Sequence, residues 1–406
     1  MKTSLLATTL FVVTTASIAL YPELNAKVMP PVTVPPIANT QPMIPPQNAV
    51  EIPNIEVVFV LDTTGSMSGM IEAAKEKIWS IASTMATADP APNIKIGLVA
   101  YRDRGDAYVT LTTDLTDDLD SVYAKLMQLQ AQGGGDTPES VNQALHEAVQ
   151  DISWSSQQNS YQVIFLVGDA PPHMDYQNDV RYQDSIAQAK SKGILVNTIQ
   201  CGNDASTKQN WQSMASLGGG DYFTVAQNGG AIAVTTPYDS KIAMIAKKIE
   251  DTRIFYGTEE KRASLKNKER LSDELYEKAS PSALARRAEF NSSASGAKNL
   301  LGESELVDDV ATGKVDVKEL DQSLLPDELR ALAPAVQQTL ISEKSEQRQR
   351  LQKALSDLTK ERRDYVENEV AGTAASEASL DYQVFETIQK QAKTKGLEYK
   401  DSDLRL

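Results

Sequence analysis

The sequence predicts an α/β fold with a doubly wound, mostly parallel sheet, followed by a mainly helical region at the carboxyl end. Two observations carry this prediction. Short apolar runs of strand length alternate with stretches of helical periodicity between residues 54 and 257. After Tyr256 the strand-like runs stop and charged residues become frequent. The first pattern favours strands covered by helices on both faces, and the second favours helices alone.

The strands are predicted from apolar runs bounded by polar turns. Residues 55–61 predict the first buried strand, and residues 94–101 predict the second. Residues 108–112 predict a shorter strand, for which an antiparallel course at the sheet edge is one option. The remaining predicted strands are residues 163–167, 194–199 and 222–225.

Helices are predicted between these strands. Residues 67–85 place isoleucines on one apolar face. A helix is predicted from Pro138 to Ile152, because proline is acceptable in the first turn of a helix. The other helices predicted in this half are residues 119–129, 179–192, 208–217 and 239–255.

The region 258–406 is predicted to be helical and charged, with helices over residues 261–290 and 340–370 and a last one over 381–397. A stripe in the second of these has a spacing of four, three and seven, which fits an amphipathic helix or a short coiled coil. A stripe packed back on the same chain is favoured over a dimer seam. The stripe consists of Leu351, Leu355, Leu358 and Tyr365.

Residues 1–26 resemble a secretory signal peptide, with Lys2, an uncharged stretch and a small-residue cleavage site near Ala19. An uncleaved membrane anchor is the alternative, but the apolar stretch is short and Pro22 ends it. Residues 27–53 are rich in proline and predict an extended linker. We therefore expect an exported protein, periplasmic or secreted, without stable membrane insertion after signal removal.

Charge and cysteine content narrow the function classes. The 406 residues carry a formal net charge of −15, which repels phosphate backbones and argues against nucleic acid as a partner. Cys201 is the single cysteine, so an intrachain disulfide is impossible. Clustered cysteines and histidines with the spacing of a zinc site are also missing from the sequence.

The most informative motif is DTTGS at residues 62–66, directly after the first predicted strand. It is expected in a loop at the carboxyl end of that strand, where open α/β sheets bind ligands. Gly65 allows the backbone to bend so that Asp62, Thr64 and Ser66 converge. Three such hard oxygens favour a divalent cation, Mg²⁺, Mn²⁺ or Ca²⁺.

This motif resembles the D-x-S-x-S metal-ion-dependent adhesion motif of von Willebrand factor type A (VWA) domains, with Thr64 in place of the first serine. Residues 133–140 (GGGDTPES) resemble the second metal loop of the family, with Thr137 as the hydroxyl ligand. Residues 161–169 (YQVIFLVGD) resemble its fourth strand and third metal loop, with Asp169 as the acidic ligand. The resemblance covers about half of the chain and implies a Rossmann-like fold. It implies metal ligation by Asp62, Thr64, Ser66, Thr137 and Asp169.

The resemblance implies recognition and not catalysis, so the chain is not expected to be an enzyme. In the family, the metal is held by hydroxyls, water and few carboxylates, with one coordination position open. Such a cation attracts an acidic side chain of a protein partner. This sequence departs from the pattern at Asp136, which precedes Thr137 and could itself ligate the metal or reduce its attraction. The identity of the second-loop ligand therefore stays open.

Two other functions compete for the same chain. Phosphoryl transfer of haloacid-dehalogenase type would use Asp62 as the nucleophile, but those enzymes need a second acid where Thr64 stands. They also do not account for residues 133–137. An assembly factor acting through its helical tail is the third reading. An aspartic protease is disfavoured, since Thr64 separates the acid from Gly65 and no second copy of the motif supplies the partner carboxylate.

Several polar residues near the same edge have undecided roles. Arg102, Asp103 and Asp106 follow the second predicted strand and would either orient the motif or form an exposed charged turn. His173 follows Asp169 by four positions and would either reach the metal rim or be a loop residue, which is favoured.

Overall fold

The computed structural model describes residues 52–135, 137–157, 159–229, 234–370 and 380–400. The predicted signal segment, nearly all of the predicted linker and Asp136 lie outside the described residues. In the described part of the chain, no helix has the length and apolar character needed to cross a membrane.

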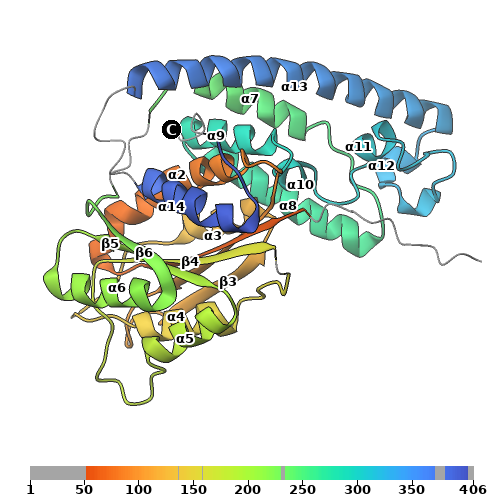
Figure 1. Cartoon of the computed structure of the whole chain (residues 1–406). Helices are drawn as coiled ribbons and strands as arrows, with labels where there is room; N and C mark the ends of the chain where they lie inside the picture. Colours follow the sequence, from red (N-terminus) through yellow and green to blue (C-terminus); the bar gives the residue numbers. More distant parts are fainter. Residues whose placement is uncertain (1–51, 136, 158, 230–233, 371–379, 401–406) are drawn as a thin grey trace, which may run out of the picture. The chain divides into compact units, whose positions relative to one another are not determined.

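Six strands form one sheet in the order β3-β2-β1-β4-β5-β6 (Figure 1). Neighbouring strands are parallel except β2 and β3, which are antiparallel. The predicted doubly wound, mostly parallel sheet is therefore confirmed. The strand order reverses between β1 and β4, which is the point where such sheets have a crevice at their carboxyl edge. The strands are β1 (Asn54–Asp62), β2 (Asn93–Tyr101), β3 (Thr110–Thr116), β4 (Ser160–Gly168), β5 (Leu195–Cys201) and β6 (Gly219–Val225).

Helices cover both faces of the sheet, because successive strand residues point to opposite sides. Val57 and Phe165 belong to the core shared with α2, α3 and α14. Val58 and Ile164 belong to the core shared with α4, α5 and α6 on the other face. Figure 1 shows these two layers above and below the strands. The helices are α2 (Ser68–Met85), α3 (Leu119–Gln128), α4 (Val141–Gln150), α5 (Tyr182–Ser191), α6 (Ala205–Gly218) and α14 (Leu380–Ala392).

Several predicted elements have different bounds in the structure, and for two helices the cause is local. Helix α4 begins at Val141 and not at Pro138, because Glu139 forms a bridge with Pro172 and is extended. The predicted helix over residues 261–290 is two helices, α8 (Glu259–Lys278) and α9 (Pro281–Asn291). Ser280 separates them, since its hydroxyl accepts a hydrogen bond from Ala283 N at 3.1 Å and caps α9.

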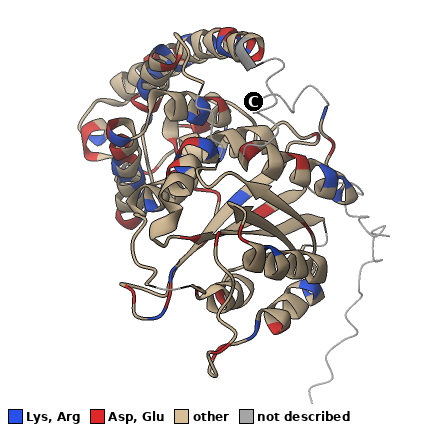
Figure 2. Ribbon diagram, turned by 90° about the vertical axis from the view of Figure 1, so that its left-hand side faces the viewer, with Lys and Arg blue, Asp and Glu red and all other residues tan. Residues whose placement is uncertain are grey.

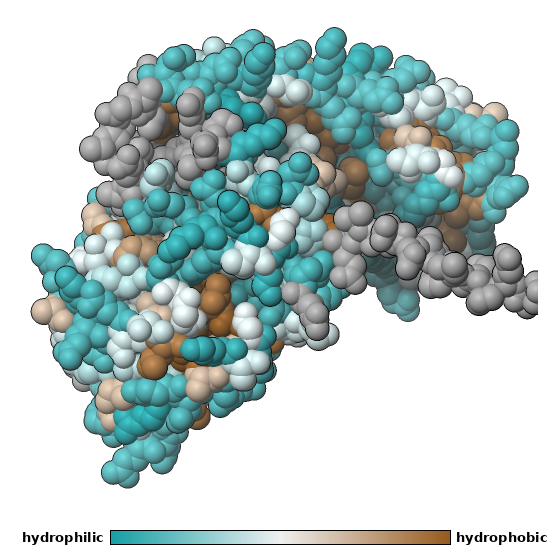
Figure 3. All heavy atoms as spheres, viewed as in Figure 1, coloured by the Kyte–Doolittle hydropathy of each residue, from teal (hydrophilic) through white to brown (hydrophobic). Residues whose placement is uncertain are grey.

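The helical region folds back on the chain. Leu355 and Leu358 of α13 (Pro334–Val370) pack with Ile242 of α7 (Asp239–Glu250) and Ala285 of α9. The predicted stripe therefore packs on the same chain, as favoured. The outer face of α13 is hydrophilic (Figure 3) and carries charges of both signs (Figure 2). Shorter helices complete the region: α10 (Ala297–Leu301), α11 (Leu306–Ala311) and α12 (Asp327–Arg330).

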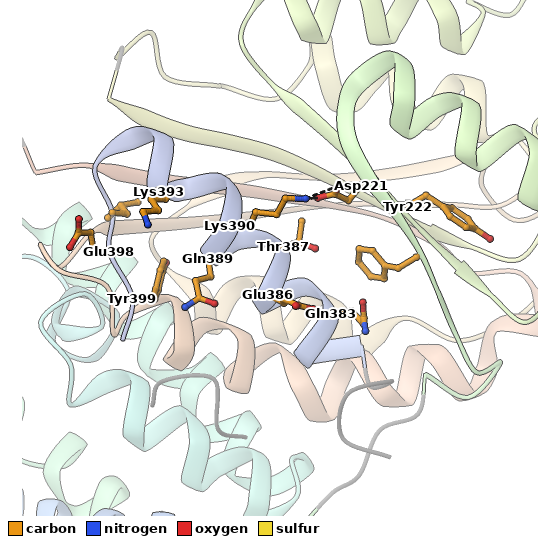
Figure 4. Close-up of a pocket in the computed structure, with 12 residues that line it drawn as sticks. Asp221, Tyr222, Gln383, Glu386, Thr387, Gln389, Lys390, Lys393, Glu398 and Tyr399 are labelled. Carbon is orange, nitrogen blue, oxygen red and sulfur yellow. Dashed lines mark hydrogen bonds and ion pairs between the residues drawn. The ribbon is translucent and has the colours of Figure 1, made fainter. Parts of the chain in front are cut away.

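Helix α14 returns to the sheet and lies along β6 and α2 (Figure 1). Its Gln391 side chain exchanges two hydrogen bonds with the amide of Asn197 on β5, at 2.9 and 3.1 Å. A groove of about 690 Å³ lies between α14 and β6, where Lys390 pairs with Asp221 at 3.0 Å (Figure 4). The described residues after 257 thus belong to one compact unit with the sheet, and the predicted domain boundary near residue 257 stays a prediction.

Candidate functional site

The first loop places three oxygen-bearing side chains at the carboxyl end of β1. Asp62 is fully buried, and its Oδ1 accepts hydrogen bonds from Thr64 N at 2.9 Å and Thr64 Oγ1 at 2.7 Å. Ser66 lies in the short 3-10 helix Gly65–Met67, with its Oγ 3.4 Å from Thr64 Oγ1. Because the Thr64 hydroxyl donates to the carboxylate, its lone pairs are left for another partner.

The second loop depends on two adjacent glycines. Gly133 and Gly134 have φ angles of +80° and +77°, which side chains other than glycine rarely adopt. The Asp106 carboxylate lies against them, and its Oδ2 accepts a hydrogen bond from Gly134 N at 3.1 Å. Gly65 N donates to Gly133 O at 3.1 Å, so the first and second loops are directly joined. Thr137 is exposed in the same loop.

Gly133→Ala is expected to lower the free energy of unfolding by about 1–3 kcal/mol, because of its positive φ. A methyl group there would also lie 2.3 Å from Asp106 Oδ1. Chemical denaturation measures the change. Gly135→Ala is the matched control, since a methyl group at Gly135 meets nothing within 4 Å. Equal stability of the two variants would contradict this account of the loop.

The third loop begins at Asp169, directly after β4. Its Oδ2 accepts a hydrogen bond from Gln227 Nε2 at 2.6 Å, and the same nitrogen lies 3.3 Å from Ser66 O. Its main-chain carbonyl accepts from Thr207 Oγ1 at 2.9 Å. Gln227, which follows β6, thus contacts both the third loop and the first.

Asp62 Oδ2, Glu139 Oε2 and the Tyr101 hydroxyl are among the buried polar atoms at this edge that have no hydrogen-bond partner within the described part of the chain. Tyr101 is the register partner of Asp62 on β2. A methyl group placed on Gly168 would lie 2.5 Å from the Tyr101 hydroxyl and 3.1 Å from Asp62 Cβ, so both side chains reach the same point. Unpaired buried polar atoms are unfavourable, and a hydrated cation is a group that could satisfy them.

The charges at this edge are unbalanced. Burial raises the pKa of Asp62 to about 7, although the Thr64 hydrogen bonds act in the opposite direction and the charge of Asp169 adds to the increase. Burial, followed by the charge of Asp62, raises the pKa of Glu139 to about 9. These carboxyl groups would therefore be stabilised by a cation, and the residues present fit one.

Carboxylates alone do not make this site. Among the residues that the structure describes, no group of three or more His, Cys, Asp and Glu side chains is arranged to hold a metal ion. The assignment of the five predicted ligands, including Thr137 and Asp169, stays a prediction.

The polar residues after β2 hold the loops in place and are not an exposed turn. Arg102 is buried and donates from Nε to Thr63 O at 3.2 Å and from Nη2 to Gln130 O at 2.7 Å. Asp103 is also buried, and its Oδ1 accepts from Ser140 Oγ at 2.8 Å. The orienting role considered for these residues is the one that the structure supports.

His173 is a buried part of the loop after β4. Its Nδ1 lies 2.8 Å from Asp175 Oδ1, and its Nε2 lies 3.3 Å from Asp103 Oδ2. Its ring stacks on Tyr176 with 4.0 Å between the ring centres. The favoured interpretation of His173 as a loop residue therefore agrees with the structure.

Three residues near the site were not singled out from the sequence: Tyr101, Glu139 and Gln227. Tyr101 ends the second predicted strand, and Glu139 follows Thr137 by two positions, so both lie beside predicted features. Gln227 lies far from the motif in the chain and has no local signal.

The fold and the loops agree with the comparison to known families. Residues 56–237 match the family model of the von Willebrand factor A domain. This segment is a VWA domain. The family match ends before α7 and therefore does not include α8–α14.

The similar proteins resemble this chain over short segments. The mouse von Willebrand factor A domain-containing protein 7 is 39% identical over 97 residues, which is 24% of this chain and 10% of the mouse protein. A putative ariadne-like RING finger protein of Acanthamoeba polyphaga mimivirus is 27% identical over 119 residues, which is 29% of this chain and 11% of the viral protein. The chain thus spans about a tenth of the length of these curated relatives.

One similar solved structure is that of proximal thread matrix protein 1 from the mussel byssus, with a zinc-occupied metal-ion-dependent adhesion motif. It covers 43% of this chain and 42% of its own chain, at 14% identity and a TM-score of 0.34.

Proposed function

We propose that the VWA domain binds a protein partner through a divalent cation, Mg²⁺, Mn²⁺ or Ca²⁺. The observation that carries the proposal is the buried Asp62 Oδ2, which has no hydrogen-bond partner among the described residues and lies beside the hydroxyls of Thr64 and Ser66. Hydroxyl and carboxylate oxygens are the ligands that such cations prefer. The residues that would hold the cation are Asp62, Thr64, Ser66, Thr137 and Asp169.

A bound cation would supply a coordination position for an acidic side chain of the partner. The protein residues that would hold it include two carboxylates and three hydroxyls. The exposed Ser66 and Thr137 lie on the side open to solvent, so an outside carboxylate could approach there. We propose such an acidic side chain as the feature that the partner contributes.

Recognition is favoured over phosphoryl transfer by the surroundings of Asp62. Its side chain is fully buried, and its Oδ1 already accepts two hydrogen bonds from Thr64. A phosphoester, which is far larger than a cation, would have to reach Oδ2 below the protein surface. VWA domains are in general interaction modules and not enzymes. Export to the periplasm or the exterior remains part of the proposal, supported by the signal-like residues 1–26.

Cation binding is expected to stabilise the full chain. Mg²⁺ or Mn²⁺ at about 100 times its Kd should raise the free energy of unfolding by about 2.7 kcal/mol, because the ligand binds the folded state alone. Asp62→Ala should abolish the corresponding rise in melting temperature. Asp151→Ala, which changes an exposed aspartate after α4, is the control and should respond as the wild type does. The site assignment is wrong if the Asp62 variant keeps the full response.

Partner capture is expected to depend on the same cation. Thr137 is exposed, so Thr137→Ala should leave the fold intact while it weakens both cation and partner binding. The measurement is recovery of partners from the native host by tagged full-length protein, in Mg²⁺ and in chelator. Partners retained equally by wild type, Thr137→Ala and chelator-treated protein would move the binding function to the helical region.

A further inference from the structure

We propose that Glu139 is an additional anionic residue of the cation site, beyond the ligands that the family motif supplies. The inference rests on the proposed function of the site, because it concerns the same cation. It assigns to Glu139 a negative charge that helps to hold the cation, through an oxygen without a hydrogen-bond partner among the residues that the structure describes.

The position of the Glu139 side chain carries the proposal. Glu139 is 3% exposed, and its Oε2 is buried without a hydrogen-bond partner within the described part of the chain. A methyl group placed on Gly134 would lie 3.1 Å from Glu139 Oε1 and 3.1 Å from Thr64 Cβ. The Glu139 carboxyl group and the Thr64 side chain therefore approach the same point beside the second loop.

The backbone of Glu139 fixes this position. Its N–H donates to Pro171 O at 3.0 Å, and its carbonyl accepts from His173 N at 3.0 Å. These bonds join the second loop to the loop that begins at Asp169. The backbone of Glu139 thus joins the second and third loops, while its carboxyl group lies near Thr64 of the first loop.

The largest charge effects on the Glu139 carboxyl group come from four acids, Asp62, Asp103, Asp106 and Asp169. The nearby guanidinium of Arg102 is directed to the carbonyls of Thr63 and Gln130. A buried carboxylate needs a cation or several donors to be stable. A divalent cation at Asp62 would supply that charge.

A charge on Glu139 would alter both the affinity of the site for the cation and the attraction of the bound cation for a partner. A cation next to Asp62, Asp169 and Glu139 is more fully neutralised than one held by hydroxyls and two carboxylates. We therefore expect tighter cation binding and a weaker attraction for an outside carboxylate than in a site without this glutamate. Removing the charge of Glu139 should therefore weaken cation binding and strengthen the attraction of the bound cation for an outside carboxylate.

The test is calorimetric titration of full-length protein with MnCl₂ alone. Glu139→Gln keeps the shape and removes the charge, and it should bind Mn²⁺ at least about 10-fold more weakly than the wild type. Glu139→Asp keeps the charge and should recover part of the affinity, which a purely structural role would not explain. Glu361→Gln, on the exposed face of α13, is the matched control and should bind as the wild type does.

The outcomes distinguish this inference from the proposed function. A wild-type protein that binds no Mn²⁺ would overturn the proposed function and this inference with it. A wild-type protein and a Glu139→Gln variant with equal affinities would overturn the inference alone. Without metal, Glu139→Gln should be at least as stable as the wild type, because it replaces a buried carboxyl group that lacks a cation with a neutral amide of the same shape. A metal-free Glu139→Gln variant that does not fold would therefore also count against the inference.

Discussion

Arg287→Met is expected to lower the free energy of unfolding by about 3–5 kcal/mol, because it leaves buried carboxylates without their cation. Arg287 is 1% exposed. Its Nε and Nη2 donate to the two oxygens of Asp120, each at 2.6 Å, and its Nη1 donates to Glu250 Oε1 at 2.5 Å. Glu250 also accepts from the Tyr276 hydroxyl at 2.7 Å. The guanidinium thus connects α3, α7, α8 and α9.

Equilibrium denaturation in urea measures this change. Arg270→Met is the matched control, since Arg270 is an exposed residue of α8 that pairs with Glu274 one turn away. Exposed pairs of this kind contribute less than about 1 kcal/mol. Similar losses in the two variants would mean that the buried network contributes no more than a surface ion pair.

The same network predicts a dependence of stability on pH. Burial alone would raise the pKa of Glu250, but the charges of Arg287 and Arg253 outweigh it and hold the pKa at about 2. The unfolded chain has a glutamate pKa of about 4.3. A pKa that is lower in the folded state gives stability that is present above about pH 4.3 and lost as the pH falls towards 2. Stability should therefore fall more steeply in this window for the wild type than for Arg287→Met.

The sequence predicted the parts of the structure that local patterns encode. The run at residues 55–61 followed by DTTGS predicted a buried strand ending in a polar loop, and Asp62 and Thr64 do lie there. Contacts between distant segments have no such pattern. Asp120 and Arg287 are separated by 167 positions. Each lies in a helix, and nothing in the local sequence distinguishes it from a solvent-exposed charged residue. Their pairing follows from how α3 and α9 pack.

The direction of the Glu139 side chain is a second feature that the sequence does not predict. Asp136 and Glu139 both lie in the second predicted loop, but only Asp136 adjoins Thr137, so the sequence pattern points to Asp136 as the second acid. The bridge between Glu139 and Pro172 turns the glutamate towards the interior, and that bridge depends on the loop after β4. The direction of this side chain is therefore a tertiary property.

The packing of α14 on the sheet is a third feature that local sequence patterns do not predict. Residues 381–397 predicted a helix, but not that it covers the sheet of a domain whose family match ends at residue 237. Asp381 pairs with Lys77 of α2 at 3.0 Å, and Gln391 accepts from the Tyr161 hydroxyl of β4 at 2.7 Å. The backbones of Asp89 and Glu398 exchange hydrogen bonds of 2.9 and 3.1 Å.

Ile388→Ala is expected to lower the free energy of unfolding by about 2–5 kcal/mol, because Ile388 is 0% exposed in the core under α14. Glu386→Ala, on the exposed side of the same helix, should change stability by less than about 0.5 kcal/mol. Thermal and urea unfolding of both variants measure the difference. Equal stabilities would mean that α14 is not part of the cooperative core.

Ending the chain at residue 257 removes α8–α13 as well as α14. The truncation takes eight buried residues out of the core that contains Tyr161 and Phe165. Burial of one such side chain contributes about 1.5–3 kcal/mol, so the summed loss rivals the 5–15 kcal/mol net stability of a typical domain. We expect residues 1–257 to aggregate or to lack a cooperative transition. A soluble, cooperatively folded product would show instead that the VWA domain is complete without the helices after residue 257. The core residues removed are Leu275, Ala283, Phe290, Leu380, Val384, Ile388, Ala392 and Leu397.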